Sequence, residues 1–252
     1  MSNLFWLTEA QMARLRPFFP KGHGRQRVDG LRALSGIIFI NRNGLWWYDA
    51  PREYGPAKAL CNRWKRWSDN RVFAGIMVGL AAEGTGPTTI MIYATSLTAH
   101  RTAGRLRAKK GGRGCQIGRT KGGMNTTLHA VTDAQCRPIR CFMSAGQVSD
   151  YTGAAALLDT LPHADWFLAD RGYDADWLRK VLQDRGIKAC IHGRKSRKQA
   201  VKYDKHRYRR RNRIEIMFGH LRDWRRIAPR YDRCPETYLS AIALAATILF
   251  WL

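Results

Sequence analysis

The sequence has few acidic residues. Its 252 residues include 19 aspartates and glutamates against 44 lysines and arginines, which gives a formal net charge of +25. Such an excess argues for a polyanionic partner. Nucleic acid is the first candidate partner, a membrane surface is the second, and a basic protein without such a partner is the third.

Cysteine pairs, a secretory leader and a long apolar run are also missing. The six cysteines form no CxxC pair and no grouping with histidine at zinc-ligand spacing. We therefore expect free thiols in a reducing cytoplasm. The one candidate membrane segment, residues 239–252, is shorter than the roughly 20 residues that a span needs. This segment predicts a buried core helix and no membrane association.

The first 83 residues have the pattern of short helices. Thr8 and Asp29 are N-cap candidates, and Gly44 ends the helix that Asp29 would open. Pro56 suits the first turn of a third helix, and residues 72–82 form a further one. We expect a helical DNA-binding domain of the helix-turn-helix type over residues 1–83.

The third expected helix is amphipathic. Leu60, Trp64 and Trp67 fall at i, i+4 and i+7 and form one apolar face. An ordinary helical bundle with a solvated basic face is the alternative to DNA binding. The residues expected to contact DNA are Lys58, Asn62, Arg63, Lys65 and Arg66.

Beyond residues 83–89, which contain glycine and proline, the pattern changes to strands. Strands alternating with helices predict a mixed α/β sheet over residues 89–252. We expect the arginine-rich runs 101–121 and 193–213 to be loops over DNA that are disordered without it. The expected strands cover residues 90–95, 126–132, 139–144, 166–170 and 187–192, and the expected helices 150–161 and 175–185.

Two carboxylates stand out. Asp170 ends an apolar strand before a turn, at the strand edge where α/β sheets bind ligands; the alternative is that it only caps the turn. On a single helix, Tyr208, Arg211, Glu215 and Arg222 would fall within an arc of about 60°. Glu215 is either a site residue or a salt-bridge partner of the arginines.

Several segments resemble DDE-type transposases of insertion sequences, in the large family numbered five: "IGRTKGGMNTTLHAVTD", "GQVSDYTGA", "LADRGYDADW" and the C-terminal "RYDRCPETYLSAIALAATILFWL". The most specific element is a Tyr-Arg-Glu-Lys motif with two, three and six intervening residues, here with arginine in the lysine place. The resemblance implies an RNase H-like core, two Mg²⁺ or Mn²⁺ ions, and cleavage and strand transfer of transposon ends. It also implies duplex DNA, both ends and target, as partner, a homodimer on that DNA, and a bacterial, nucleoid-associated location.

The same resemblance assigns roles to individual residues. Asp170 and Glu215 match the second and third metal-binding acids. Arg211 and Arg222 are suited to clamp phosphates, and Tyr208 to position the backbone of the DNA end.

Tyr93 stands where the family pattern has its first catalytic aspartate. The family segment resembles Ile-Asp-Ala-Thr, and this chain has Ile-Tyr-Ala-Thr at residues 92–95. A phenol with a pKa of about 10 is neutral at pH 7 and binds Mg²⁺ poorly. We therefore expect impaired cleavage, and a catalytically inactive DNA-binding protein or repressor is the alternative function.

Three further readings stay open at this stage. Asp133 ends the strand expected beside Tyr93 and could replace the missing acid, although the family pattern contains it too. Tyr93 could be a nucleophile with His100 and Arg101 near it in sequence. A basic RNA-binding protein has the least support, because no RNA-binding motif is present.

Overall fold

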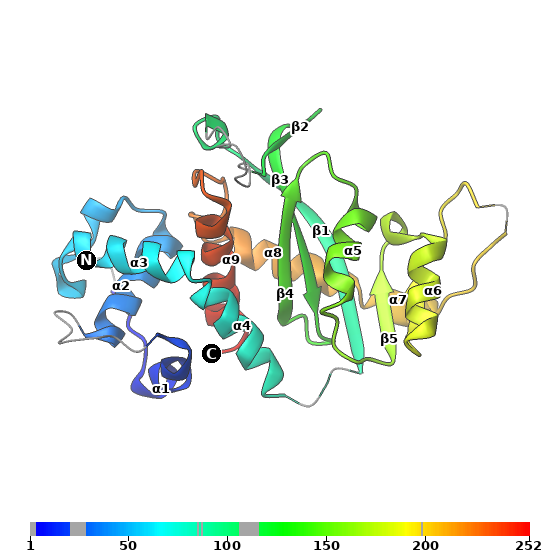
Figure 1. Cartoon of the computed structure of the whole chain (residues 1–252), viewed down its shortest axis with the longest axis horizontal. Coiled ribbons are helices and arrows are strands. Elements are labelled where there is room, and N and C mark those ends of the chain that lie inside the picture. Colours follow the sequence, from blue (N-terminus) through cyan, green and yellow to red (C-terminus); the bar gives the residue numbers. More distant parts are fainter. Residues whose placement is uncertain (1–3, 21–28, 85, 87, 106–115, 198) are drawn as a thin grey trace.

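The computed structural model describes residues 4–20, 29–84, 86, 88–105, 116–197 and 199–252. It is elongated, with a group of helices at one end, a mixed sheet at the other, and the C-terminal helix α9 (Pro235–Phe250) between them (Figure 1).

Four α-helices form the N-terminal end: α1 (Glu9–Leu15), α2 (Gly30–Asn43), α3 (Ala57–Asp69) and α4 (Val72–Ala82). The predicted caps are confirmed, because Thr8 accepts from the backbone of Gln11 and Asp29 from that of Arg32. Gly44 closes α2 in the left-handed conformation, with φ of 64°. Pro56 is the N-cap of α3, one residue before the predicted position inside its first turn.

One hydrophobic core joins these helices to the sheet. It contains Ile37 of α2 and Trp64 of α3, and continues to Met91 and Leu128 on the strands. The buried segment Ala241–Thr247 of α9 belongs to this core and contacts α3, α4 and the sheet. The prediction of a buried core helix is confirmed. Within the described residues, no helix combines the length and apolar character needed to cross a membrane.

The described strands form a single mixed sheet in the order β2-β3-β1-β5-β6, with β4 also paired to β3. β1 is antiparallel to β3 and parallel to β5, and β5 is parallel to β6. This mixed α/β sheet with flanking helices confirms the predicted fold class. The strands are β1 (Thr89–Thr98), β2 (Gly118–Thr120), β3 (Gly123–Thr132), β4 (Pro138–Ala145), β5 (Trp166–Ala169) and β6 (Lys188–Ile191).

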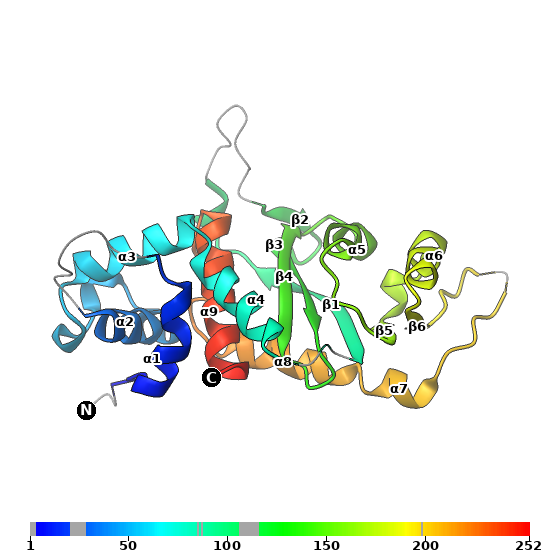
Figure 2. The same cartoon turned by 60° about the horizontal axis from the view of Figure 1, so that its bottom comes forward.

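Helices cover both faces of the sheet. α5 (Asp150–Leu158) and α6 (Asp176–Asp184) lie on one face, and α7 (Lys205–Arg209) and α8 (Asn212–Arg222) on the other (Figure 2). Successive side chains of β1 point to opposite faces of the sheet. Ile90 and Ile92 belong to the core under α5 and α6, whereas Met91 belongs to the core shared with α8 and α9.

The expectation that both basic runs are loops is wrong in part. Within 193–213, residues 205–209 form α7 and residue 212 begins α8; within 101–121, residues 118–120 form β2. Short-range contacts account for these elements, because Asp204 caps α7 through the backbone N–H groups of His206 and Arg207, and β2 pairs with β3. Residues 106–115 of the first run lie outside the described residues.

Candidate active site

Strand pairing brings Tyr93 and Asp170 to one edge of the sheet. Met91 of β1 is opposite Leu168 of β5 in a parallel pair, and the same register carried forward sets Tyr93 level with Asp170. Asp170 follows the last residue of β5, at the carboxyl end of the strand. Its Oδ1 accepts the backbone N–H of Gly172 at 2.8 Å, so Asp170 also caps the following turn.

The phenol of Tyr93 is half-buried between aromatic and charged groups. Its ring centroid lies 6.0 Å from that of Phe218, and the guanidinium carbon of Arg211 lies 5.1 Å from the ring centroid. Burial raises the pKa of Tyr93, the charges of Glu215 and Asp170 raise it further, and Arg211 opposes them. Tyr93 is therefore neutral at pH 7 and adds no negative charge to this edge.

The prediction that Tyr208 and Glu215 share one continuous helix is wrong. α7 ends at Arg209, and α8 begins at Asn212 with Arg211 as its N-cap. Through the junction, backbone N–H groups donate to carbonyls three residues back, as from Arg211 to Tyr208 at 3.0 Å. The junction lies within a run of arginines, and like charges three and four residues apart disfavour a continuous α-helix.

Arg211 nevertheless unites the predicted residues. Its Nη1 lies 3.0 Å from Oε1 of Glu215, and its guanidinium carbon lies 5.6 Å from the ring centroid of Tyr208. The pKa of Arg211 is raised. Burial alone would lower it, but the neighbouring Tyr208, Glu215 and Asp170 raise it by more. The structure thus gathers Tyr93, Asp170, Tyr208, Arg211 and Glu215 into one group.

Arg222, the last residue of the motif, contacts β1 instead of this group. Its Nη2 donates to Oγ1 of Thr95 and, at 3.0 Å, to the carbonyl oxygen of Ser96. The side chain therefore ties the end of α8 to the strand that carries Tyr93. The sequence gives no signal for this contact, because the two residues are more than 120 positions apart.

Two residues that the sequence analysis did not assign to the site lie beside Asp170. Asp150 is the first residue of α5, and Tyr173 is fully buried in the turn after Asp170. Burial raises the pKa of Asp150, and the charge of Asp170 raises it further. In the sequence Asp150 has only the appearance of a helix-capping residue, so a pattern search could not find it.

Two alternatives concern the surroundings of Tyr93: Asp133 as a replacement for the missing acid, and His100 as a partner of a nucleophilic Tyr93. Asp133 follows β3 at the far end of the pair, because Tyr93 is opposite Ala130 and Met91 opposite Thr132. The Asp133 carboxylate accepts from the backbone and the side chain of Arg137. His100 lies beyond the end of β1 at Thr98 and contacts Thr102 and Tyr231. The hydrogen bonds and ring contacts of Asp133 and His100 within the described residues are therefore with groups other than Tyr93.

The five predicted DNA contacts lie on α3, which Figure 1 places on the other side of α9 from the sheet. Lys58, Asn62 and Arg66 are exposed, and Lys65 pairs with Asp69 at 3.0 Å. Arg63 is half-buried and donates to the backbone oxygen of Asp29. The structure therefore keeps this basic face apart from the group around Arg211.

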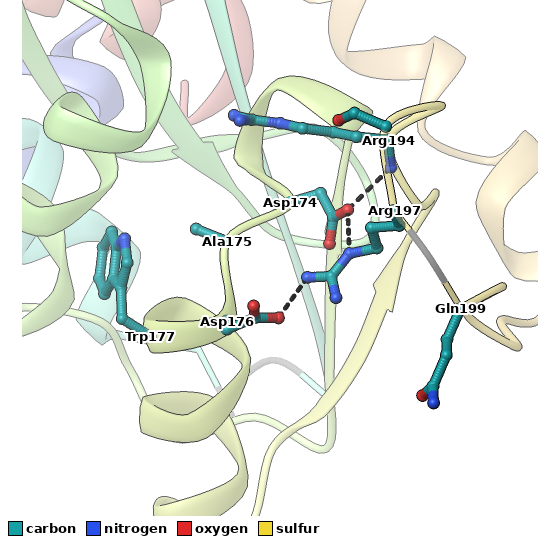
Figure 3. A pocket seen from close by; sticks show the side chains of 8 residues that line it. Asp174, Ala175, Asp176, Trp177, Arg194, Arg197 and Gln199 are labelled. Atoms are coloured by element: carbon teal, nitrogen blue, oxygen red, sulfur yellow. Dashed lines mark hydrogen bonds and ion pairs between the residues drawn. The ribbon is translucent and has the colours of Figure 1, made fainter.

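A hollow of about 730 Å³ adjoins the turn after Asp170 (Figure 3). Asp174 accepts from Nε of Arg197 at 2.6 Å and from the backbone N–H of Arg194 at 2.8 Å. Burial alone would raise the pKa of Asp174, but these and a further arginine contact lower it to about 2. Since the Arg194 side chain also donates to the Gly172 carbonyl, the loop after β6 braces the turn that carries Asp170.

The positions of the family motif do not fit a two-ion site. They supply two carboxylates, Asp170 and Glu215, and a neutral phenol, and Arg211 already neutralises Glu215. Within the described residues, no three histidine, cysteine, aspartate or glutamate side chains converge as metal ligands. A pair of divalent ions needs several carboxylates to hold it.

Comparison with known proteins identifies the family. A family model described as "Transposase DDE domain" matches residues 84–250, more than half of the chain, and a model for transposases of the IS4/5 family matches residues 7–77. A Brucella ovis protein assigned as a transposase for insertion sequence element IS6501 is 33% identical over 130 residues, covering 51% of this chain and 99% of its own length. A Burkholderia cepacia protein assigned likewise for element IS402 is 28% identical over 153 residues, 53% of this chain and 70% of its own.

A solved structure supports the fold. The piggyBac transposase, in a synaptic complex with hairpin DNA, superposes with a TM-score of 0.53 at 9% identity, over 97% of this chain and 72% of that one. At this identity the likeness speaks for the fold alone, and it confirms the RNase H-like arrangement that the sequence resemblance implied. From the match of the DDE domain model over residues 84–250, we conclude that the chain belongs to the DDE transposase family.

Proposed function

We propose that this chain is a transposase that binds the terminal repeats of an insertion sequence, and that its metal-dependent cleavage and strand transfer are impaired. One observation carries the proposal: the neutral phenol of Tyr93 lies level with Asp170, under the guanidinium of Arg211. The family motif has its first carboxylate at this place.

Duplex DNA is the proposed partner, both as transposon ends and as target. The net charge of +25 supports a polyanionic ligand, and the piggyBac relative in fold is bound to DNA. We assign end recognition to residues 1–83, through the basic face of α3, and catalysis to residues 89–252. On the DNA, Tyr208, Arg211 and Arg222 would contact the backbone, and two copies of the chain would hold the paired ends.

DDE transposases in general use divalent metal ions. When bound, such ions activate the attacking hydroxyl and stabilise charge on the leaving oxygen. In this chain Asp170 and Glu215 are the proposed ligands for Mg²⁺ or Mn²⁺, and the phenol of Tyr93 is a poor ligand for a hard cation. Losing one metal-binding carboxylate should lower the cleavage rate by roughly 10²- to 10³-fold.

The test compares the parent chain with Tyr93→Asp on a supercoiled plasmid that carries the element ends, in Mg²⁺ and then in Mn²⁺. We expect nicked and joined products from the aspartate variant only, and their loss when Asp170→Asn is added. Tyr93→Asn is the matched control, because it has the size of aspartate without its charge. Cleavage by the parent that Asp170→Asn abolishes would contradict the proposal, and equal cleavage by Tyr93→Asn would show that bulk, not charge, is limiting.

The neutral phenol at residue 93 also favours a second function, that of a catalytically inactive, sequence-specific DNA-binding protein or repressor. The ion pair between Arg211 and Glu215 supports it, since it neutralises one of the two remaining acids. Such a protein would bind the ends equally well in EDTA and would inhibit an active relative that shares them. If affinity for the ends requires metal, the repressor function is wrong.

A further inference from the structure

Two large aromatic side chains are exposed in the segment between α2 and α3. Trp46 is 79% exposed and Tyr48 is 89% exposed, the highest values among the large hydrophobic side chains that the structure describes. Single exposed hydrophobic residues are common on protein surfaces, but two such rings within three residues concentrate apolar surface, as contact sites do. We call Trp46 and Tyr48 the aromatic pair.

Trp47, which lies between the two residues of the aromatic pair, anchors the segment. Its ring centroid lies 6.1 Å from that of Trp64 on α3 and 5.7 Å from the guanidinium carbon of Arg226. In the short 3₁₀ helix that follows, the backbone N–H of Asp49 donates to the carbonyl of Trp46 at 3.0 Å. A folded segment therefore presents the aromatic pair next to α3, which lowers the ordering cost of binding.

Exposed arginines lie at the start of this segment. The backbone N–H of Arg225 donates to the carbonyl of Arg42 at 3.0 Å, and both residues are exposed. The Cβ of Arg225 lies 2.8 Å from the point that a Cβ atom on Gly44 would occupy, two residues before Trp46. Glycine at residue 44 therefore allows Arg225 to approach the backbone beside the aromatic pair.

A hollow of about 430 Å³ adjoins Tyr48 at the beginning of α3. Its lining includes Arg32, Arg52 and Ala57, the first residue of α3. Both arginines are exposed, and Arg32 also donates to the carbonyl of Arg52 at 3.2 Å. The fold thus sets arginines before the aromatic pair and beside it.

The charge of this surface decides between two kinds of partner. The four arginines outnumber the two acids of the segment, Asp49 and Glu53. In a symmetric dimer through this face, the arginines of both copies would be brought together and would repel one another. DNA instead offers phosphates to the arginines, and the faces of sugars and bases to the aromatic rings. The surface therefore fits DNA better than it fits a second copy of the chain.

We propose that Trp46 and Tyr48 pack against bases and deoxyriboses of the element end beside α3, while the arginines around them contact its phosphates. This inference rests on the proposed function, because it needs the element ends as partner, and it adds a nonionic contact to that binding. Aromatic rings stack on any base, since every base has a π-face. The aromatic pair therefore contributes affinity, and sequence readout is left to other residues.

The test measures binding of a fluorescein-labelled duplex of the element end to the full chain, by fluorescence anisotropy at several salt concentrations. We expect Trp46→Ala and Tyr48→Ala each to weaken binding by roughly 5- to 100-fold. The slope of log K against log salt concentration should stay unchanged in both, because no ionic contact is lost, whereas in Arg42→Ala it should fall in magnitude by about 1. Trp177→Ala is the matched control, because that residue is 37% exposed on α6, at the opposite end of the molecule from α3 (Figure 1).

Further variants and a second measurement separate stacking from other effects. Trp46→Phe keeps an aromatic ring and should retain binding within several-fold. An equal loss of affinity in Trp177→Ala would overturn the inference. So would sedimentation without DNA in which the parent is a dimer and Trp46→Ala a monomer, because the aromatic pair would then join two copies.

The same titration distinguishes failure of this inference from failure of the proposed function. Affinity equal to that of the parent in both Trp46→Ala and Tyr48→Ala overturns the inference alone. No binding of the element end by the parent overturns the proposed function, and the inference with it.

Discussion

Helices α3 and α8 have similar sequence patterns and different surroundings. Each buries one apolar face, with Trp64 on α3 and Phe218 on α8, and each carries basic residues beside that face. On α3 the basic face is exposed to solvent. On α8, Arg222 is bonded to β1, and Arg211, at its start, is paired with Glu215. The same amphipathic basic pattern therefore leaves its charges exposed in one region and fixes contacts of the candidate site in the other.

The largest expected effect is the gain of cleavage by Tyr93→Asp. The next largest should be the loss of folding stability when the buried face of α3 or of α8 is truncated, and we expect the two losses to be equal. Phe218→Ala and Trp64→Ala each remove a side chain that is at most 3% exposed. Each should lower the free energy of unfolding by about 3–5 kcal/mol in urea denaturation. Ile216→Ala is the control, because Ile216 is 57% exposed and should cost less than about 1 kcal/mol. A much smaller cost for either large residue would show that its helix is loosely packed.

The sheet region contains a buried histidine, His129, that should make the free energy of unfolding depend on pH. Burial lowers the pKa of His129 on β3 to about 4, so the folded state binds the proton less tightly than the unfolded state. Its stabilising contribution is complete above pH 6.5 and is lost as the pH falls through 4, by about 3 kcal/mol.

The measurement is the free energy of unfolding between pH 7 and 4 for the parent, His129→Gln and the exposed control His163→Gln. We expect a flatter pH dependence in His129→Gln alone. An unchanged profile in that variant would mean that other groups control acid unfolding.

The smallest effects per residue should come from α3. Lys58→Ala and Arg66→Ala remove exposed charges and should leave the free energy of unfolding within about 0.5 kcal/mol of the parent. If α3 contacts DNA, each variant should bind the element ends more weakly. The slope of log K against log salt concentration should also fall in magnitude by about 1. Arg14→Ala, at another exposed arginine, is the control. Unchanged affinity and salt slope in both α3 variants would remove the helix-turn-helix prediction.

Much of the fold could be predicted because local rules and tertiary structure agree. The caps at Thr8 and Asp29, the strands around Tyr93 and Asp170, and the apolar C-terminal helix follow from capping chemistry and hydrophobic pattern. Their ends shifted by a few residues, as for β1, which reaches Thr98. Strand ends depend on partner strands, and those lie far away in the sequence.

The sequence by itself determined the family, the amphipathic faces and the identity of the acids, because each is written in residue type and spacing. Only the tertiary structure decided which groups meet. It broke the helix between Tyr208 and Glu215, bound Arg222 to β1, and brought Asp150 to Asp170 across Gly172. These outcomes depend on packing and charge pairing between segments distant along the chain, and no local pattern encodes the distance between two side chains on different elements.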